Sequence, residues 1–368
     1  MRRQISRVID ENQERRRTLF IVHGDRRWFI SRQQATRGPL SSALTFVETA
    51  TTPSDSSPFV AREMHVIVTS AIVGAVMPIL TVRHVTSYIY KRPVTFGEHR
   101  MMLRPRDDGD QKVLASEVAI TPAPSQISWT RDMFGNHVAT ASFAEPASEL
   151  HFESTIRLDH VPAAFRAADI ESRARTYPFA YAEEEQSDLA CFLAPLYPHP
   201  QVDRWAATFL REDGSADTYQ LLVDMTQTIE KTFKHVARHE KGVQEPARTL
   251  QCASGSCRDL AVFMISALRS LGIAARFVSG YLHLGDEDDD CVVGGNTHAW
   301  VQVYVPGPGW IDFDPSSGMV GNQNLVRVAV VHDPREAIPL QGTWIGTASD
   351  HLAMKVAVKV TAATNVDA

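Results

Sequence analysis

The sequence has little cysteine. Four occur in 368 residues, at Cys191, Cys252, Cys257 and Cys291. A small secreted domain stabilised by disulfides is far richer in cysteine. The low count excludes a disulfide scaffold and favours a reducing compartment, so we expect a cytoplasmic protein. Each cysteine is then considered as a free thiol, which can pack in a core, bind a metal or act as a nucleophile.

The sequence also lacks a marked excess of charge. It has 37 basic and 43 acidic residues, giving a formal net charge of −6. Proteins that bind nucleic acids usually carry a basic excess, so we expect no nucleic-acid partner. The apolar content of 44% and charged content of 22% are typical of globular proteins, and the length allows two domains with ordinary cores.

One apolar run, residues 64–82, reaches the length of a membrane span. Ser70 and Pro78 interrupt it, and period-two alternation beginning at Thr81 favours a β-strand, so we predict no firm membrane association. The preceding residues hold ten arginines and no lysine up to Arg37, followed by a Ser/Thr/Pro-rich stretch. Residues 1–76 are therefore predicted to be an unstructured or non-native leader.

Residues 77–160 alternate between apolar and polar side chains with turn signals between the alternating segments. The clearest segments are residues 113–120, 138–143 and 150–158. This pattern predicts an antiparallel β-sandwich. Its function could be to select substrate or act as a lid, or it could be a structural companion to the following domain.

The remaining chain has mixed patterns and makes the overall fold class α+β. Residues 161–200 are predicted to be an irregular connector. Apolar stripes at helical spacing predict helices over residues 202–210 and 218–236, which open a domain of residues 201–345. Residues 346–368 are predicted to be a C-terminal tail.

Cys257 is predicted to lie in the first turn of a helix. Ser254 and Ser256 are suitable N-caps, an apolar stripe runs from Leu260 to Leu271, and Gly272 stands where the helix should stop. The partial positive charge at a helix start lowers the pKa of a thiol. The free backbone N–H groups there could also hold an oxyanion.

His298 and Asp314 are predicted to face the same side of a hairpin. Residues 297–305 and 310–314 alternate strictly around a Pro/Gly turn. A five-residue loop would place Asp314 opposite Trp300 and diagonal to His298, close enough to orient an imidazole. Asp312 would lie nearer the turn and be solvated.

Other roles for the cysteines are less well supported. Cys252 could be the nucleophile, but it precedes the capped helix rather than opening it. Zinc binding by Cys252, Cys257, Cys291 and His298 matches no compact zinc motif, so no metal or cofactor is expected. The acidic loop of residues 285–290 lacks the ligand pattern of an EF-hand and is predicted to be a solvated turn, which could favour a basic acceptor such as lysine.

Four motifs carry a family resemblance. Gly-Ser-Cys257-Arg-Asp, the segment from Arg276 to Tyr281, Thr-His298-Ala-Trp and Gly-Trp-Ile-Asp-Phe-Asp314-Pro resemble the core of the bacterial transglutaminase-like superfamily. Segments between Tyr88 and Asn136 are similar to the N-terminal region found in one bacterial branch. The resemblance spans about residues 77–345, which suggests Met77 as the native start.

The resemblance implies a papain-like α+β catalytic domain with the triad Cys257, His298 and Asp314. It also implies acyl transfer on amide bonds through a thioester, from a protein or peptide donor to water or a primary amine. A cysteine peptidase or amidase remains an alternative, and so does a catalytically silent binding or scaffold module. Trp300 and Tyr281 could line the substrate cleft or pack in the core.

Overall fold

The chain forms two compact units, residues 1–75 and 76–368. The computed structural model describes the strands β1 (Thr18–His23), β2 (Arg26–Arg32) and β3 (Leu44–Thr49), and residues 79–363 except 162–163, 239 and 284–296. In the first unit the three strands form an antiparallel sheet in the order β1-β2-β3. Three segments of the predicted unstructured or non-native leader thus form strands, and they are rich in β-branched and aromatic residues. That the leader is non-native stays a prediction. The proposed start at Met77 lies outside the described residues.

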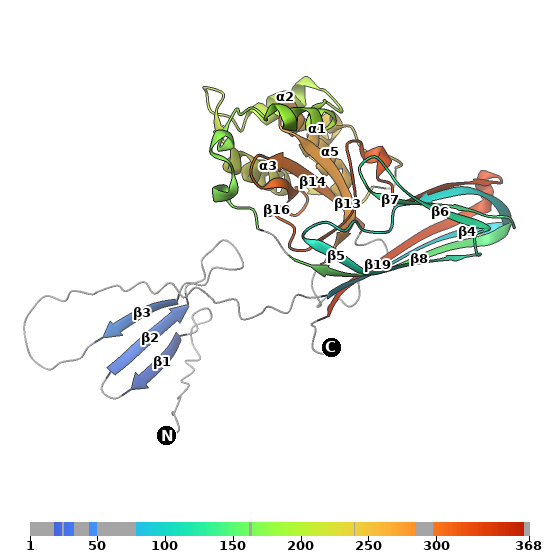
Figure 1. The fold of residues 1–368 in the computed structure, drawn as a ribbon, viewed down its shortest axis with the longest axis horizontal. Helices are drawn as coiled ribbons and strands as arrows, with labels where there is room; N and C mark the ends of the chain where they lie inside the picture. Colours follow the sequence, from blue (N-terminus) through green and yellow to red (C-terminus); the bar gives the residue numbers. More distant parts are fainter. Residues whose placement is uncertain are drawn as a thin grey trace, which may run out of the picture. The chain divides into compact units, whose positions relative to one another are not determined.

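The second unit contains a curled sheet organised around one long strand, β4 (Ile79–Met101). The first half of β4 pairs with β8 (Ala147–His160) and β19 (His351–Ala363). The far end pairs with β7 (His137–Ser142) and β18 (Leu340–Ile345). β5 (Gln111–Thr121) and β6 (Gln126–Arg131) complete the path β5-β8-β4-β7-β6. Figure 1 shows β4, β8 and β19 running side by side.

The strand pairing of this sheet differs from two of the predictions. The strands of residues 79–160 join a single curled sheet through β4, so a separate sandwich is not what the pairing describes. Residues 351–363, predicted to lie in a tail, form β19 along β4. Their alternation of apolar and polar side chains from Met354 to Val360 is the period of a strand, and it is satisfied only by pairing with a segment far away in sequence.

The other lobe holds a five-stranded sheet in the order β16-β15-β14-β13-β17, covered by helices (Figure 1). Its strands are β13 (Ala275–Leu282), β14 (Thr297–Val305), β15 (Gly309–Asp314), β16 (Met319–Val320) and β17 (Leu325–Val331). The helices are α1 (Glu183–Leu193), α2 (Pro200–Ala207), α3 (Thr218–Thr232), α4 (Pro246–Cys252) and α5 (Cys257–Ser270). α1 lies within the predicted connector, so that segment is not wholly irregular.

Short elements complete this lobe. Two-residue strands pair as β9 (Thr176–Tyr177) with β10 (Ala216–Asp217), and β11 (Lys234–His235) with β12 (Ser254–Gly255). Single 3-10 turns occupy Ala167–Asp169, Ser172–Ala174, Pro334–Glu336 and Ala348–Asp350.

The main core surrounds α5. Every side chain from Asp259 to Arg269 is buried, so α5 is enclosed by α2, α3, α4 and the sheet instead of presenting one solvent face. Phe263 of α5, Phe277 of β13 and Phe313 of β15 are fully buried in this core. A helix held on all sides gives Cys257, its first residue, a fixed position.

Two amide side chains join the curled sheet to the edge strand β17. Gln111 donates to the carbonyl of Arg327 at 2.7 Å and accepts from the Arg327 N–H at 3.0 Å. Asn136 makes the same pair of bonds with Val330, at 2.8 and 2.9 Å. Both amides act as a short substitute for a neighbouring strand and cover an otherwise open edge. These contacts favour a structural companion over a lid.

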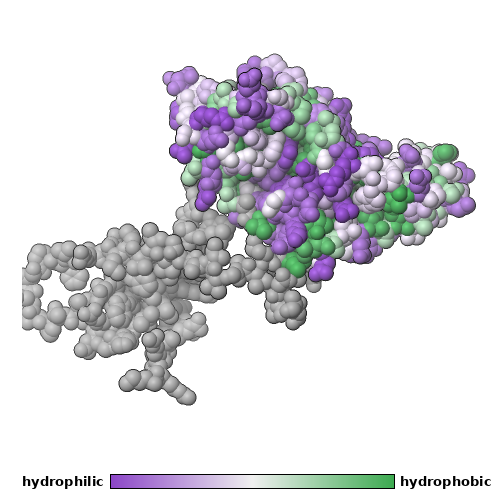
Figure 2. Space-filling view, in the orientation of Figure 1, coloured by the Kyte–Doolittle hydropathy of each residue, from purple (hydrophilic) through white to green (hydrophobic). Residues whose placement is uncertain are grey.

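The surface shown in Figure 2 is mixed, with apolar patches over the curled sheet. Exposed apolar side chains there include Ile127 and Trp129 on β6 and Met354 on β19. Within the described part of the chain, none of the helices has the length and apolar character needed to cross a membrane.

Candidate active site

Cys257 opens helix α5, as predicted, and its cap is strongly held. The Ser256 hydroxyl accepts from the Asp259 N–H, and the Asp259 carboxylate accepts from the Ser256 N–H at 2.9 Å, which forms a capping box. Asp259 is fully buried and also accepts from Arg238 Nη1 at 2.8 Å. This ion pair fixes the turn that carries the thiol.

The hairpin register agrees with the prediction. Val301 lies opposite Phe313 and Val305 opposite Gly309. Continued by one residue, this register places Asp314 opposite Trp300 and diagonal to His298. Because Val305 pairs with Gly309, the loop has three residues, 306–308, instead of the predicted five. Both lengths are odd and give the same register, which brings the imidazole and the carboxylate to the same face.

Asp314 holds His298 in one orientation. His298 Nε2 lies 2.8 Å from Asp314 Oδ2, and both residues are buried. Asp314 is itself fixed by hydroxyl donors, Ser316 Oγ at 2.7 Å and Ser317 Oγ at 2.6 Å. Because Nε2 is directed at Asp314, Nδ1 is the ring nitrogen left for the thiol.

Three groups stabilise the thiolate of the half-buried Cys257. These are the side chains of His235 and His298 and the backbone N–H of Ala299. Burial raises the pKa of the thiol, but these three groups and the charge of His298 outweigh burial, and the pKa falls to about 6. The thiolate is therefore the main form at neutral pH.

The imidazole and carboxylate complete an ion-paired chain. Burial lowers the pKa of His298, but its bonds to Asp314 and Cys257 overcome this and raise the pKa to about 10. Burial likewise raises the pKa of Asp314, while the bond to His298 brings it below the ordinary value. Between about pH 6, the pKa of Cys257, and about pH 10, the pKa of His298, the site holds a thiolate beside an imidazolium. In this state the cysteine is a nucleophile and the neighbouring imidazolium is an acid.

His235 was missed by the sequence analysis. It lies in β11, whose parallel pairing with β12 places it opposite Gly255, two residues before Cys257. No motif marks it, and a two-residue strand is too short to give a periodic signal. Only the long-range pairing reveals that it reaches the thiol.

Trp300 and Tyr281, predicted as possible cleft residues, are both buried and belong to the core. Trp300 stacks on His298 with ring centroids 6.0 Å apart and donates from Nε1 to Asp312 Oδ1 at 2.6 Å. Its N–H is thus occupied and does not serve as an oxyanion donor. The Tyr281 hydroxyl lies 3.0 Å from His84 Nδ1 on β4, so it joins the two sheets.

Asp312 is not solvated, contrary to the prediction. It is buried, and its Oδ2 lies 3.0 Å from Arg327 Nη1. Arg327 also bonds Asp110, in the turn before β5. Burial raises the pKa of Asp312, while the Arg327 charge opposes this. The sequence could not show this pair because Arg327 is on β17, which is not adjacent to β15 in the sheet.

Other predicted residues lie elsewhere or outside the described residues. Cys252 is exposed at the end of α4. Arg258 donates to the carbonyls of Pro334 and Ala337 and lies over the Phe277 ring, so it is structural. Cys291 and the acidic loop of residues 285–290 fall outside the described residues. Among the residues that are described, no cluster of His, Cys, Asp and Glu could hold a metal.

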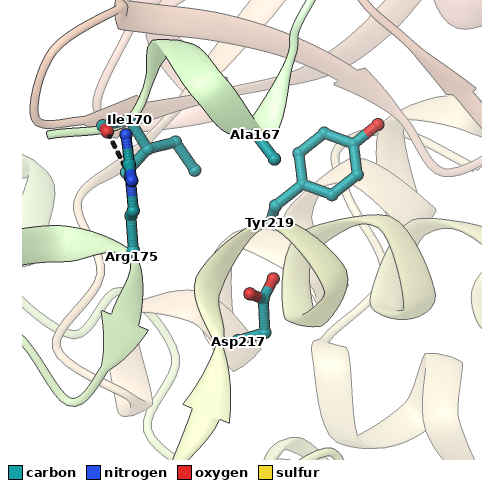
Figure 3. Close-up of a pocket in the computed structure, with 5 residues that line it drawn as sticks. All are labelled: Ala167, Ile170, Arg175, Asp217 and Tyr219. Atoms are coloured by element: carbon teal, nitrogen blue, oxygen red, sulfur yellow. Dashed lines mark hydrogen bonds between the residues drawn. The ribbon is translucent and has the colours of Figure 1, made fainter. Parts of the chain in front are cut away.

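A small cavity of about 50 Å³ lies apart from these residues (Figure 3). Arg175 and Ile170 stand on one side, joined by an Arg175 Nε bond to the Ile170 carbonyl at 3.1 Å, and Asp217 and Tyr219 stand across from them. None of its lining residues belongs to the thiol site, and it has no thiol or imidazole.

Comparisons with known proteins agree with this geometry. Residues 205–315 match the transglutaminase-like superfamily, and residues 80–159 match the bacterial transglutaminase-like N-terminal region. An uncharacterized protein of Mycobacterium leprae is 26% identical over 290 residues, covering 76% of this chain and 98% of that protein. An uncharacterized protein of Mycobacterium tuberculosis is 29% identical over 293 residues, covering 76% of this chain and 91% of that protein.

A solved structure shows the same fold. The crystal structure of a protein from Cytophaga hutchinsonii, described as a candidate cysteine protease, has a TM-score of 0.59 at 20% identity and covers 79% of this chain and 92% of that one. The fold and the family matches support thiol-dependent catalysis in general. Residues 205–315 thus match the transglutaminase-like superfamily and residues 80–159 its bacterial N-terminal region, which confirms the resemblance found in the motifs.

Proposed function

We propose that this protein transfers an acyl group from an amide donor through a thioester on Cys257. The observation that carries the proposal is the buried pair of His298 Nε2 and Asp314 Oδ2, 2.8 Å apart, together with a Cys257 thiol at the start of α5 whose pKa His298 lowers. A buried carboxylate that fixes an imidazole beside a helix-start thiol supports nucleophilic catalysis.

In the first half of the reaction the Cys257 thiolate attacks the amide carbonyl carbon, and a C–S bond forms. Negative charge develops on the carbonyl oxygen, where backbone N–H groups at the start of α5 would stabilise it. The C–N bond then breaks, and His298 gives its Nδ1 proton to the departing amine or ammonia.

In the second half an acceptor attacks the thioester. Water or a primary amine bonds to the carbonyl carbon, gives a proton to the neutral His298 and releases the Cys257 thiolate. The half-buried position of Cys257 leaves the thioester within reach of water, and the Cytophaga hutchinsonii protein is described as a candidate cysteine protease. Hydrolysis of peptide or amide bonds is therefore the second candidate function.

We propose a protein or peptide as the acyl donor, in a cytoplasmic setting consistent with the low cysteine content. A primary amine, including a lysine side chain, is the proposed acceptor in the transfer reaction. A silent binding or scaffold module is the alternative from another class, and an unreactive Cys257 would support it.

The test incubates the protein with a glutamine- and lysine-containing protein and a tagged primary amine. Cys257→Ala removes the nucleophile, and Cys252→Ala is the matched control at an exposed thiol. Tag incorporation by the native protein and the Cys252 variant, but not by the Cys257 variant, is expected for transamidation. Deamidation or cleavage without the tag would identify a hydrolase, and no product with any donor would contradict the proposal.

A further inference from the structure

A second histidine reaches the thiol from a different element. His235 lies between two backbone hydrogen bonds: Lys234 N–H donates to the Ala253 carbonyl at 2.8 Å, and Val236 N–H donates to the Gly255 carbonyl at 2.9 Å. These bonds hold its backbone beside the segment that leads into α5. The pairing places His235 opposite Gly255, two residues before Cys257, and the His235 side chain stabilises the Cys257 thiolate.

The two histidines meet the sulfur in different surroundings. His298 is buried on β14 and restrained by Asp314, whereas His235 is exposed on β11 and keeps contact with solvent. The titratable groups that act on His235 are Cys257 on α5, His298 on β14 and Asp314 at the end of β15.

We propose that His235 is a second catalytic imidazole, which binds the Cys257 sulfur from the solvent side and shares the thiolate with His298. This proposal rests on the proposed function, in which Cys257 is the nucleophile. The physical reason is that a half-buried thiolate needs more than one donor to offset its desolvation. His298 supplies one side-chain donor, because its other nitrogen is directed at Asp314, and His235 supplies the second.

The pKa values agree with this geometry. The bond to Cys257 raises the pKa of His235 above its ordinary value against the opposing effect of burial. For Cys257, the His235 bond is the largest of the effects that lower the thiol pKa. Loss of His235 should therefore return the thiol toward the behaviour of an ordinary cysteine, with His298 still in place.

The experiment measures the rate of Cys257 alkylation by iodoacetamide from pH 4.5 to 9.5, followed by mass spectrometry of the Cys257 peptide. The native profile is expected to have its midpoint near pH 6. In His235→Phe, which keeps a ring but removes both nitrogens, the midpoint should rise by about one unit or more. His351→Phe, at an exposed histidine of β19, is the matched control and should leave the midpoint unchanged.

His235→Gln serves as a second variant if the phenylalanine variant does not fold. It keeps a donor but loses the positive charge, so a smaller upward shift is expected. An unchanged midpoint in a folded His235 variant would overturn the inference. Alkylation needs no acyl donor, so a shifted midpoint in a protein inactive on all donors would keep this inference and refute the proposed function. Acyl transfer by a protein whose alkylation midpoint does not shift in the His235 variants would support the proposed function and overturn this inference.

Discussion

Removal of the Arg327 guanidinium should destabilise the protein strongly. Arg327 is 5% exposed and lies 3.0 Å from Asp312, itself 5% exposed at the side chain. In Arg327→Met the carboxylate of Asp312 stays buried with the Trp300 N–H but without its cation. Leaving a buried charge without its partner costs about 3–5 kcal/mol. For a unit of this size the loss should lower Tm by roughly 6–15 °C.

Calorimetry at fixed pH and ionic strength measures the effect, with a surface pair as control. Arg83 bonds Glu153 at 2.6 Å but is 59% exposed, so Arg83→Met should change stability by less than about 1 kcal/mol. The double variant Arg327→Met with Asp312→Leu removes the stranded charge and should recover much of the loss. The reasoning is refuted if Arg327→Met costs no more than Arg83→Met, or if the double variant is no more stable than Arg327→Met.

Three further predictions concern the site and its core. The pH–rate profile should be bell-shaped, rising as Cys257 loses its proton near pH 6 and falling as His298 loses its proton near pH 10; a profile without an acid limb near pH 6 would contradict the ion pair. Asp314→Asn keeps the size but removes the charge that fixes His298, so kcat/KM should fall by roughly 10²–10⁴-fold while the urea midpoint changes much less, and retained activity would remove Asp314 from the catalytic site. Phe263→Ala empties a fully buried position in α5 and should cost about 3–5 kcal/mol in urea unfolding, whereas a cost below about 1 kcal/mol would mean that the core collapses around it.

The sequence predicted those parts of the site whose signals are local. The start of α5 follows from a capping serine and an apolar stripe within one segment. The placement of His298 beside Asp314 follows from strand alternation and loop parity within one hairpin. Each depends on interactions between residues close together in the chain, which composition and period can report.

The missed parts depend on contacts between distant segments. His235 approaches the thiol through a parallel pair of two-residue strands, β11 and β12. Asp312 is buried and paired with Arg327, which lies three strands away in the sheet. Alternation placed Asp312 on the correct face but could not report what covers that face. The same limit explains β19, whose alternation was visible but whose partner was not.

The pairing of β19 with β4 has a consequence for biosynthesis. β4 precedes the other described strands of its unit, yet its partner β19 along residues 79–90 is made only after all of those strands. Until then one edge of the first half of β4 exposes unpaired backbone groups, which can join other chains. A nascent chain stalled before residue 351 would therefore be a substrate for chaperones, whereas synthesis of residues 351–363 would close that edge.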